Sequence, residues 1–261
     1  MKIVLIGRGR LATNLLPALQ KAGHEVTSVN SRTLEELPAK ADVYIISVKD
    51  SALQEVIRSA TQGREDQLFV HTAGSMPMSV FEGCCQRYGV FYPMQTFSKE
   101  RMVDFQEIPL FIEAADHTKG STAAAEPLAV LRALADSVSR KVYELSTEQR
   151  KFLHLAAVFA CNFANHCYAL SAEVLTRVGL PFDVMLPLID ETARKVHDLH
   201  PLDAQTGPAV RYDENVIRMQ KALLDDERMR TIYEEMSQSI HEHTNKNHDT
   251  LRLAEDTSHR V

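Results

Sequence analysis

The sequence divides near residue 146 into two parts with different periodicity. Before that point, short β-branched runs alternate with helical patterns, which predicts a mostly parallel sheet covered by helices. After it, apolar residues recur at helical spacing and no run is typical of a strand. We therefore expect an α/β domain over residues 1–146 and an all-helical domain over residues 147–261.

The predicted elements follow from these runs. Strands are expected at 2–7, 24–30, 42–48, 67–72, 88–93, 109–114 and 141–146. Helices are expected at 10–22, at 51–60 with Asp50 as its cap, and at about 121–136. The helical part begins with one long helix at 147–178, stopped by Gly179 and Pro181. Helices at 182–199, 213–225 and 226–245 and a polar, His-rich tail follow.

Composition excludes several classes of protein. Apolar residues make up 44% and charged residues 25% of the 261 residues, as in an ordinary globular protein. The net charge of −6 argues against a nucleic-acid partner. No apolar run is long enough to cross a membrane, and the first residues do not resemble a signal peptide. The four cysteines show no zinc or disulfide spacing, so we expect a cytoplasmic protein without a metal.

A glycine-spaced turn follows the first predicted strand. The run "GRGRLA" at residues 7–12 gives the pattern G-x-G-x-x-A between a strand and a helix. Gly7 permits the tight turn, Gly9 lets a pyrophosphate approach the backbone, and Ala12 lets the helix pack closely on the strand. The N–H groups at the helix start, including that of Leu11, would bind the pyrophosphate charge. The alternative is a strand–helix turn that binds no ligand.

The end of the second strand bears on the choice of dinucleotide. An NAD enzyme usually has Asp or Glu here to bind the ribose 2′-hydroxyl, whereas this chain has Asn30, Ser31 and Arg32. Hydroxyls and a guanidinium suit a 2′-phosphate, which favours NADP. The alternative is that Arg32 is a solvated loop residue or pairs with Glu35 or Glu36.

Three further residues are candidate cofactor contacts. Arg8 and Arg10 lie inside the glycine motif, and Val48 ends the third strand. Each arginine could lean over the cofactor phosphates or simply point into water.

Polar residues follow the fourth and fifth strands. Ligands of open α/β sheets bind at the carboxyl ends of the strands, which here read "HTAGS" and "YPMQTFS". Thr72, Ser75 and Gln95 offer donors and acceptors without a fixed charge, and Gly74 allows a close backbone approach. We predict a substrate pocket here, although each residue alone could be an ordinary loop residue or helix cap.

The long helix carries polar residues within an apolar sequence. At 100° per residue, one side of it would hold the residues His154, Val158, Cys161, Asn162, Asn165 and Tyr168. Buried polar groups need partners, which could be other protein groups or a bound nicotinamide and substrate. In the second case His154 would donate a proton, because imidazole exchanges protons near neutral pH, and Asn165 would polarise the substrate.

Two features near the C-terminus receive structural interpretations. Asp213 is expected to cap the helix after "DAQTGPAVRYDEN", and Arg211 to form a salt bridge or bind a substrate anion. His241 and His243 are two residues apart on a helix, which matches no metal spacing, so we interpret them as part of a solvated terminus.

Several of these segments together resemble one known family. They are "VLIGRGRLATNLL", "NSRT", "ADVYIISVKDSALQEV", "VHTAGSMP", "YPMQTFS" and "TGPAVRYDEN". The family joins an N-terminal Rossmann-like domain to a C-terminal domain of unknown function 2520. More distantly, the first half is similar to pyrroline-5-carboxylate reductase, to 6-phosphogluconate and 3-hydroxyacid dehydrogenases, and to F420-dependent NADP oxidoreductases.

The resemblance implies a Rossmann-type sheet that binds NADP, a helical domain that dimerises, and oxidoreductase activity. Two residues depart from the relatives' patterns. Tyr212 stands where the family's loop has a glycine, and Val158 follows His154 where hydroxyacid dehydrogenases have a lysine and an asparagine four residues apart.

The leading hypothesis is an NADP(H)-dependent oxidoreductase. It would pass a hydride to or from a small carbonyl, imine or alcohol bound between the two domains. The alternatives are an NADP-binding sensor without turnover and a helical dimerisation module with a vestigial nucleotide domain.

Overall fold

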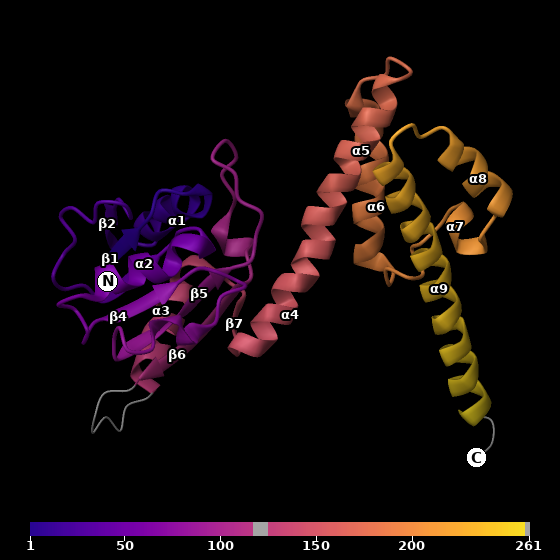
Figure 1. Cartoon of the computed structure of the whole chain (residues 1–261). Coiled ribbons are helices and arrows are strands. Elements are labelled where there is room, and N and C mark those ends of the chain that lie inside the picture. Colours follow the sequence, from indigo (N-terminus) through magenta and orange to yellow (C-terminus); the bar gives the residue numbers. More distant parts are fainter. Residues whose placement is uncertain (117–124, 259–261) are drawn as a thin grey trace. The chain divides into compact units, whose positions relative to one another are not determined.

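The computed structural model describes the backbone of residues 1–116 and 125–258 and the side chains of residues 1–115 and 126–245. It divides into two compact units, Met1–Asn162 and Phe163–Val261. The first unit is built on a seven-stranded sheet in the order β2-β1-β3-β4-β5-β6-β7 (Figure 1). Its strands are β1 (Lys2–Ile6), β2 (Glu25–Val29), β3 (Val43–Ile46), β4 (Leu68–His71), β5 (Arg87–Pro93), β6 (Leu110–Asp116) and β7 (Val142–Glu144). An α/β fold with a mostly parallel sheet, followed by a helical part, is therefore confirmed.

The order of the strands creates a switch point beside β1. The chain passes from β1 to β2 on one side and then returns to pair β3 with the other side of β1. Only β5 and β6 pair antiparallel among the described strands. Ligands of such sheets bind where the strand order reverses, outside the carboxyl ends of the strands.

Both faces of the sheet are buried, which explains why its strands are almost continuously apolar. Ile3 and Leu5 point to the face covered by α1 (Arg10–Lys21) and α3 (Ala125–Val138). Val4 and Ile6 point to the opposite face, which α2 (Asp50–Thr61) covers. Successive side chains of a strand alternate between the faces, so one apolar strand contributes to two cores.

The predicted capping role of Asp50 is wrong. Asp50 is the first residue of α2, and the N-cap position belongs to Lys49, whose side chain makes no capping bond. The carboxylate of Asp50 instead accepts a hydrogen bond from the Ser75 hydroxyl. The carboxylate that the sequence suggested as a helix cap therefore binds Ser75, in the loop after β4. The first residues of the helix predicted at about 121–136 lie outside the described residues.

The remaining helices follow the last strand. They are α4 (Thr147–Ala157), a π-helical turn (Val158–Phe163), α5 (Ala164–Thr176), α6 (Leu186–Asp198), α7 (Pro208–Arg211), α8 (Glu214–Ala222) and α9 (Glu227–Ser258). Short 3₁₀ helices lie at Met78–Phe81, Phe105–Glu107 and Phe182–Met185. The stop after the long helical stretch is as predicted, because Gly179 adopts a left-handed φ of +68°.

The compact first unit extends beyond the end of the sheet. It includes α4, whose Leu153 packs with Val90, Tyr92 and Phe111 of the sheet. The sheet itself ends close to the predicted boundary at residue 146, and the helix that follows it still belongs to the same core.

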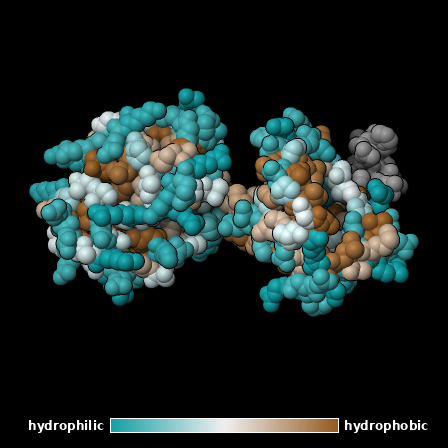
Figure 2. Space-filling view, turned by 90° about the horizontal axis from the view of Figure 1, so that it is seen from above, coloured by the Kyte–Doolittle hydropathy of each residue, from teal (hydrophilic) through white to brown (hydrophobic). Residues whose placement is uncertain are grey.

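The second unit leaves much of its apolar surface uncovered. Among its described side chains only Leu224, Met229 and Ser237 are buried, whereas Val178 is 69% and Leu188 is 62% exposed. Figure 2 shows hydrophobic residues reaching the surface of this helical unit. Among the described residues, no helix combines the length and the apolar character needed to span a bilayer.

Candidate functional site

The glycine turn lies at the switch point of the sheet. Gly7 has a φ of +123°, and a Cβ placed on it would lie 2.1 Å from the carbonyl oxygen of Ser47. Its N–H donates to the Val29 carbonyl at 3.0 Å, and the Ser47 N–H donates to the Ile6 carbonyl at 2.8 Å. The chain itself therefore requires glycine at position 7, because the ends of β1, β2 and β3 meet there.

Gly9 is not required by the chain in the same way. Its φ of −77° suits any residue, and a Cβ placed on it would meet no atom within 4 Å among the described residues. It precedes α1 as the N-cap, no side chain caps the helix, and the first turn contains no acidic residue. The first N–H groups of α1 have no intrahelical partner and no capping side chain, so they favour an anion such as the phosphate of a dinucleotide. The turn thus fits the predicted pyrophosphate.

The segment after β2 forms a compact turn. The side-chain oxygen of Asn30 accepts the N–H of Arg32 at 3.0 Å, and the carbonyl of Asn30 accepts the N–H of Leu34 at 2.9 Å. Arg32 is exposed, and no ion pair among the described residues includes it, so Glu35 and Glu36 do not hold it. Its guanidinium is available for an anion beside the turn.

The other two arginines of the motif are also exposed. Neither Arg8 nor Arg10 forms an ion pair with another described residue. Arg10 differs from Arg8 in that it lines a cavity. Val48 lies next to the glycine turn, since its Cγ1 is 3.5 Å from the position of a Cβ on Gly7.

The cavity that Arg10 lines has a volume of about 540 Å³ and belongs entirely to the first unit. It is bounded by the start of α1, the segment after β5, α4 and the π-helical turn. Its lining residues are Arg10, Tyr92, Met94, Gln95, Thr96, Phe97, Leu153, His154, Ala156, Ala157, Ala160, Cys161 and Asn162. The structure thus brings together three residues predicted from different parts of the sequence, Arg10, Gln95 and His154.

Of the residues predicted for the substrate pocket and for catalysis, three are not among those that line this cavity. Thr72 is buried and its N–H donates to the Ile46 carbonyl, while the Ser75 hydroxyl donates to Asp50. Asn165 belongs to α5 in the second unit. The expectation that a substrate binds between the two domains stays a prediction.

His154 makes a specific contact that sequence reasoning missed. Its Nδ1 lies 3.1 Å from the hydroxyl of Tyr92, and Tyr92 is 8% exposed. A Cβ on Gly74 would come within 2.6 Å of this Nδ1 and 2.7 Å of the Tyr92 ring. Gly74, noted in the sequence for a close approach to backbone, therefore makes room for the Tyr92–His154 pair. Burial raises the pKa of Tyr92 above its ordinary value, although Arg150 opposes the shift.

A buried ion pair anchors the start of α4. Arg150 is 1% exposed and donates to the carboxylate of Glu113 and to the Met76 carbonyl. Glu113 also accepts the N–H and the hydroxyl of Thr147, each at 2.8 Å. The Nε of Arg150 has no hydrogen-bond partner among the described residues. Arginine is rarely buried, so the sequence offered little signal for this anchor.

His71, at the end of β4, is buried and uncharged. Burial, helped by the nearby positive charge of Arg150, lowers its pKa from 6.5 to about 3. Its Nδ1 accepts the Ala73 N–H at 3.1 Å, and its Nε2 lies 3.4 Å from the Pro77 carbonyl, to which it donates. These two bonds fix the tautomer with the proton on Nε2.

A π-helical turn interrupts the long helix and changes which side chains lie on one face of it. A π-helix bonds residue i to i+5, so a constant 100° per residue does not hold across Val158–Phe163. The regular spacing that placed His154 and Asn165 on one face therefore does not apply between them, and their shared face stays a prediction. Cys161 and Asn162, inside the turn, line the cavity. Such turns are often found at functional sites.

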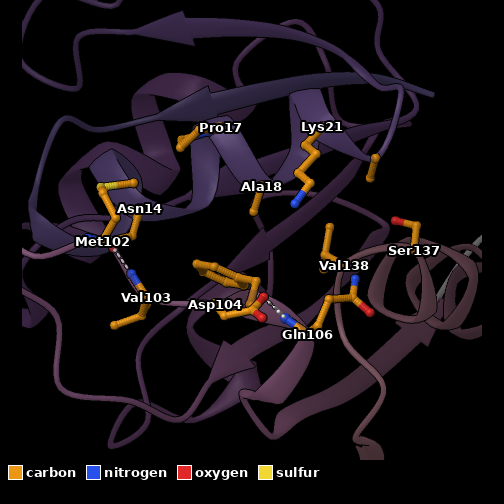
Figure 3. Close-up of a pocket in the computed structure, with 12 residues that line it drawn as sticks. Asn14, Pro17, Ala18, Lys21, Met102, Val103, Asp104, Gln106, Ser137 and Val138 are labelled. Atoms are coloured by element: carbon orange, nitrogen blue, oxygen red, sulfur yellow. Dashed lines mark hydrogen bonds between the residues drawn. The ribbon is translucent and has the colours of Figure 1, made fainter.

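A second cavity, of about 490 Å³, lies between α1, the segment 102–106 and the end of α3 (Figure 3). Three of its polar side chains, those of Asn14, Asp104 and Ser137, already have partners within the protein. Asn14 bonds the Val103 N–H, Asp104 accepts the Gln106 N–H, and the Ser137 hydroxyl donates to Leu134. This cavity is where the chain after β5 docks on α1, and it contains no residue of the glycine turn.

The C-terminal predictions have mixed outcomes. Asp213 caps α8 by accepting the Val216 N–H, as expected. Tyr212 has a left-handed φ of +50°, a conformation that glycine adopts most easily, and glycine is the residue that the family resemblance led us to expect at this position. His241 is not simply solvated, because its ring lies 4.9 Å from that of Tyr212 and its Nδ1 lies 3.1 Å from the Val210 carbonyl. Within the described part of the chain, no three His, Cys, Asp or Glu side chains are grouped to hold a metal ion.

These features define a class of protein, one with a dinucleotide-binding sheet and a polar cavity beside its glycine turn. Two family models match the chain. Residues 2–59 match the family described as NADP oxidoreductase, coenzyme F420-dependent, and residues 118–240 match the domain of unknown function DUF2520. The search of curated proteins found no significant match.

Solved structures extend the comparison over nearly the whole chain. The putative NADP oxidoreductase BF3122 from Bacteroides fragilis is 53% identical, with a TM-score of 0.81 over 92% of this chain and 98% of its own. A protein from Thermotoga maritima is 20% identical, with a TM-score of 0.68 over 94% of this chain and 99% of its own. Pyrroline-5-carboxylate reductase from Streptococcus pyogenes is 14% identical, with a TM-score of 0.60 over 93% and 98%. The last two show the fold alone.

The chain therefore belongs to the family that joins an NADP oxidoreductase domain to a DUF2520 domain. The family resemblance stated from the sequence is confirmed, and so is NADP as the cofactor of this family.

Proposed function

We propose that this protein reduces a small carbonyl compound, or oxidises the corresponding alcohol, with NADP(H) as the hydride carrier. The observation that carries the proposal is the cavity that joins Arg10 of the glycine turn to His154 and Gln95. It combines a nucleotide-binding edge with a proton-exchanging group in one cavity that is open to solvent on one side.

The cofactor half of the site rests on the two turns. The backbone at Gly7, Gly9 and Leu11 would hold the pyrophosphate, and Ser31 with Arg32 would hold the 2′-phosphate. Bound NADPH would supply the hydride for the reduction.

The substrate half rests on the lining of the cavity. Gln95 would donate a hydrogen bond to the substrate, and His154 would give the proton that the carbonyl oxygen takes up as its carbon accepts the hydride. None of the described lining residues is a carboxylate. This lining favours an uncharged carbonyl over a protonated imine, because a cation would find no counter-charge. Asn165 stays a candidate for polarising the substrate.

A turnover screen tests this function. NADPH consumption is followed at 340 nm with a panel of aldehydes, ketones, imines and F420-type acceptors, for the unchanged protein and for His154→Gln. We expect turnover of at least one carbonyl, lowered about 10²-fold or more in His154→Gln, and unchanged in His197→Gln, whose exposed histidine lies on α6. Equal rates in His154→Gln and the unchanged protein would contradict the role of His154.

The second candidate function is an NADP-binding sensor that turns nothing over. It is favoured by the absence of a carboxylate–histidine pair among the described residues of the cavity. Tight NADPH binding without turnover of any compound in the panel would support it.

We also propose that the helical unit forms a homodimer. Its exposed apolar side chains, such as Val178 and Leu188, outnumber what its described core buries, and a second copy of the same surface would cover them. Sedimentation analysis should give a dimer at micromolar concentration and a monomer for Leu188→Glu. A monomer for the unchanged protein would contradict this arrangement.

A further inference from the structure

We propose that Tyr92 is a positioning residue that holds His154 by its Nδ1 and so turns its Nε2 toward the cavity. The proposal rests on the proposed function, because it specifies how the proton-exchanging residue is oriented. Nothing in the sequence pattern of the long helix suggests it, since Tyr92 lies at the end of β5, sixty-two residues away in the chain.

The packing leaves the pair little freedom. The Tyr92 hydroxyl and Nδ1 of His154 are 3.1 Å apart, and the two rings meet edge to face with centroids 6.1 Å apart. Gly74 lies directly against both, where even a single Cβ would lie 2.9 Å from the Tyr92 hydroxyl. Residues of β5, α4 and the loop after β4 are thus packed around one hydrogen bond.

The hydrogen-bond inventory favours one tautomer. The Tyr92 hydroxyl and the imidazole Nδ1 have each other as partner, and no other described residue bonds either atom or His154 Nε2. With neutral imidazole, an Nδ1–H donor would leave the Tyr92 O–H without an acceptor, whereas a hydroxyl that donates to Nδ1 is satisfied and places the ring proton on Nε2. With imidazolium, Nδ1 donates to the hydroxyl oxygen and Nε2 still carries a proton. In both states the cavity receives an N–H, which can bond or protonate a substrate oxygen.

Among the titratable groups near the pair, no described carboxylate contacts His154, so the Tyr92 hydroxyl is its one described hydrogen-bond partner. Arg150, one turn earlier on α4, is buried and is paired with Glu113. Arg10 lines the cavity from α1, Cys161 lines it from the π-helical turn, and His71 near Arg150 is uncharged. Burial raises the pKa of Tyr92, so its hydroxyl keeps its proton at neutral pH. A hydroxyl partner can switch between donor and acceptor, whereas a carboxylate could only accept.

The first test is spectroscopic and needs neither cofactor nor substrate. In the full-length protein with ¹⁵N-labelled histidine, long-range ¹H–¹⁵N correlation spectra report the tautomer of each ring. His71 serves as an internal reference for the Nε2–H form, and the spectrum of His154→Gln identifies the His154 signals. We expect neutral His154 in the Nε2–H form, and a mixture of tautomers in Tyr92→Phe.

A mixture or an Nδ1–H form in the unchanged protein would overturn the proposal, and so would a Tyr92→Phe spectrum identical to that of the unchanged protein. Because this test uses no substrate, it stands even if the turnover screen finds no activity. Circular dichroism of Tyr92→Phe checks that the sheet is intact.

The second test is kinetic. In Tyr92→Phe the Nδ1–H of imidazolium loses its acceptor at a partly buried position, which costs the charged form more than the neutral one. We expect the alkaline limb of the kcat/KM profile for carbonyl reduction, where His154 loses the proton it must donate, to move to lower pH by about half to one unit. We also expect kcat to fall roughly three- to tenfold while the KM for NADPH stays unchanged. An unshifted profile in an active Tyr92→Phe enzyme would overturn the proposal.

Discussion

Alanine at the two glycines of the turn should affect different properties: Gly7→Ala should lower the stability of the fold, and Gly9→Ala should weaken NADPH binding. In Gly7→Ala the new Cβ would lie 2.1 Å from the Ser47 carbonyl oxygen at a φ of +123°. The left-handed strain costs about 1–3 kcal/mol, and separating β1 from β3 to relieve the overlap adds further loss. We expect a total destabilisation of about 3–5 kcal/mol, or roughly 6–20 °C in Tm. In Gly9→Ala the Cβ meets no described atom, so the unfolding free energy should change by no more than about 1 kcal/mol.

For equal amounts of folded protein, Gly9→Ala should weaken NADPH binding more than Gly7→Ala does. A methyl group on Gly9 would occupy the space that the pyrophosphate needs, at a cost of about 1–3 kcal/mol, or roughly 5- to 150-fold in Kd. Thermal unfolding followed by circular dichroism and titration of NADPH fluorescence measure the two quantities. Gly83→Ala is the matched control, because Gly83 has a left-handed φ of +76° but no described atom near a Cβ. Unchanged NADPH affinity in Gly9→Ala would refute a pyrophosphate at this turn.

Three further substitutions test other parts of the account. Arg32→Ala should weaken NADPH binding about 10- to 100-fold and leave NADH binding unchanged, measured by titration with Arg58→Ala as the exposed control. Glu113→Gln leaves the buried guanidinium of Arg150 without its counter-charge and should lower the unfolding free energy by about 3–5 kcal/mol in urea, whereas a change below about 1 kcal/mol would contradict the anchor. Because the pKa of His71 falls from 6.5 to about 3 on folding, only the unfolded chain takes up this proton between those pH values. Stability should therefore fall as the pH drops below 6.5, by up to about 1.4 kcal/mol per pH unit, and His71→Gln should show a shallower slope.

The sheet was predictable because both of its faces are buried. β1, β3 and β4 read as apolar runs bounded by turns, and their observed limits differ from the predicted ones by only a residue or two. Gly179 and Asp213 act locally, so their roles at helix ends were also visible in the sequence. Local preferences of this kind do not depend on distant parts of the chain.

The interactions that the sequence did not reveal are between distant residues. The acceptor that Ser75 finds in Asp50, the ion pair of Arg150 with Glu113, and the contact of Tyr92 with His154 each join segments far apart in the chain. The π-helical turn was missed because its shifted backbone bonding leaves no signature in the spacing of polar residues. For the Tyr92–His154 contact the one available signal was Gly74. A glycine there indicated that another part of the chain comes close, but it did not indicate which side chains.

The most direct test of the account is a comparison of NADPH and NADH binding to the unchanged protein. The central claim is that the turn at Gly7 and Gly9 binds a dinucleotide and that Arg32 selects the one with a 2′-phosphate. Calorimetric titration of both nucleotides under one buffer and salt concentration measures this difference. We predict that NADPH binds about tenfold or more tightly than NADH, because the guanidinium adds a charge-assisted contact. Equal affinity for the two nucleotides, or binding of neither, would contradict the account.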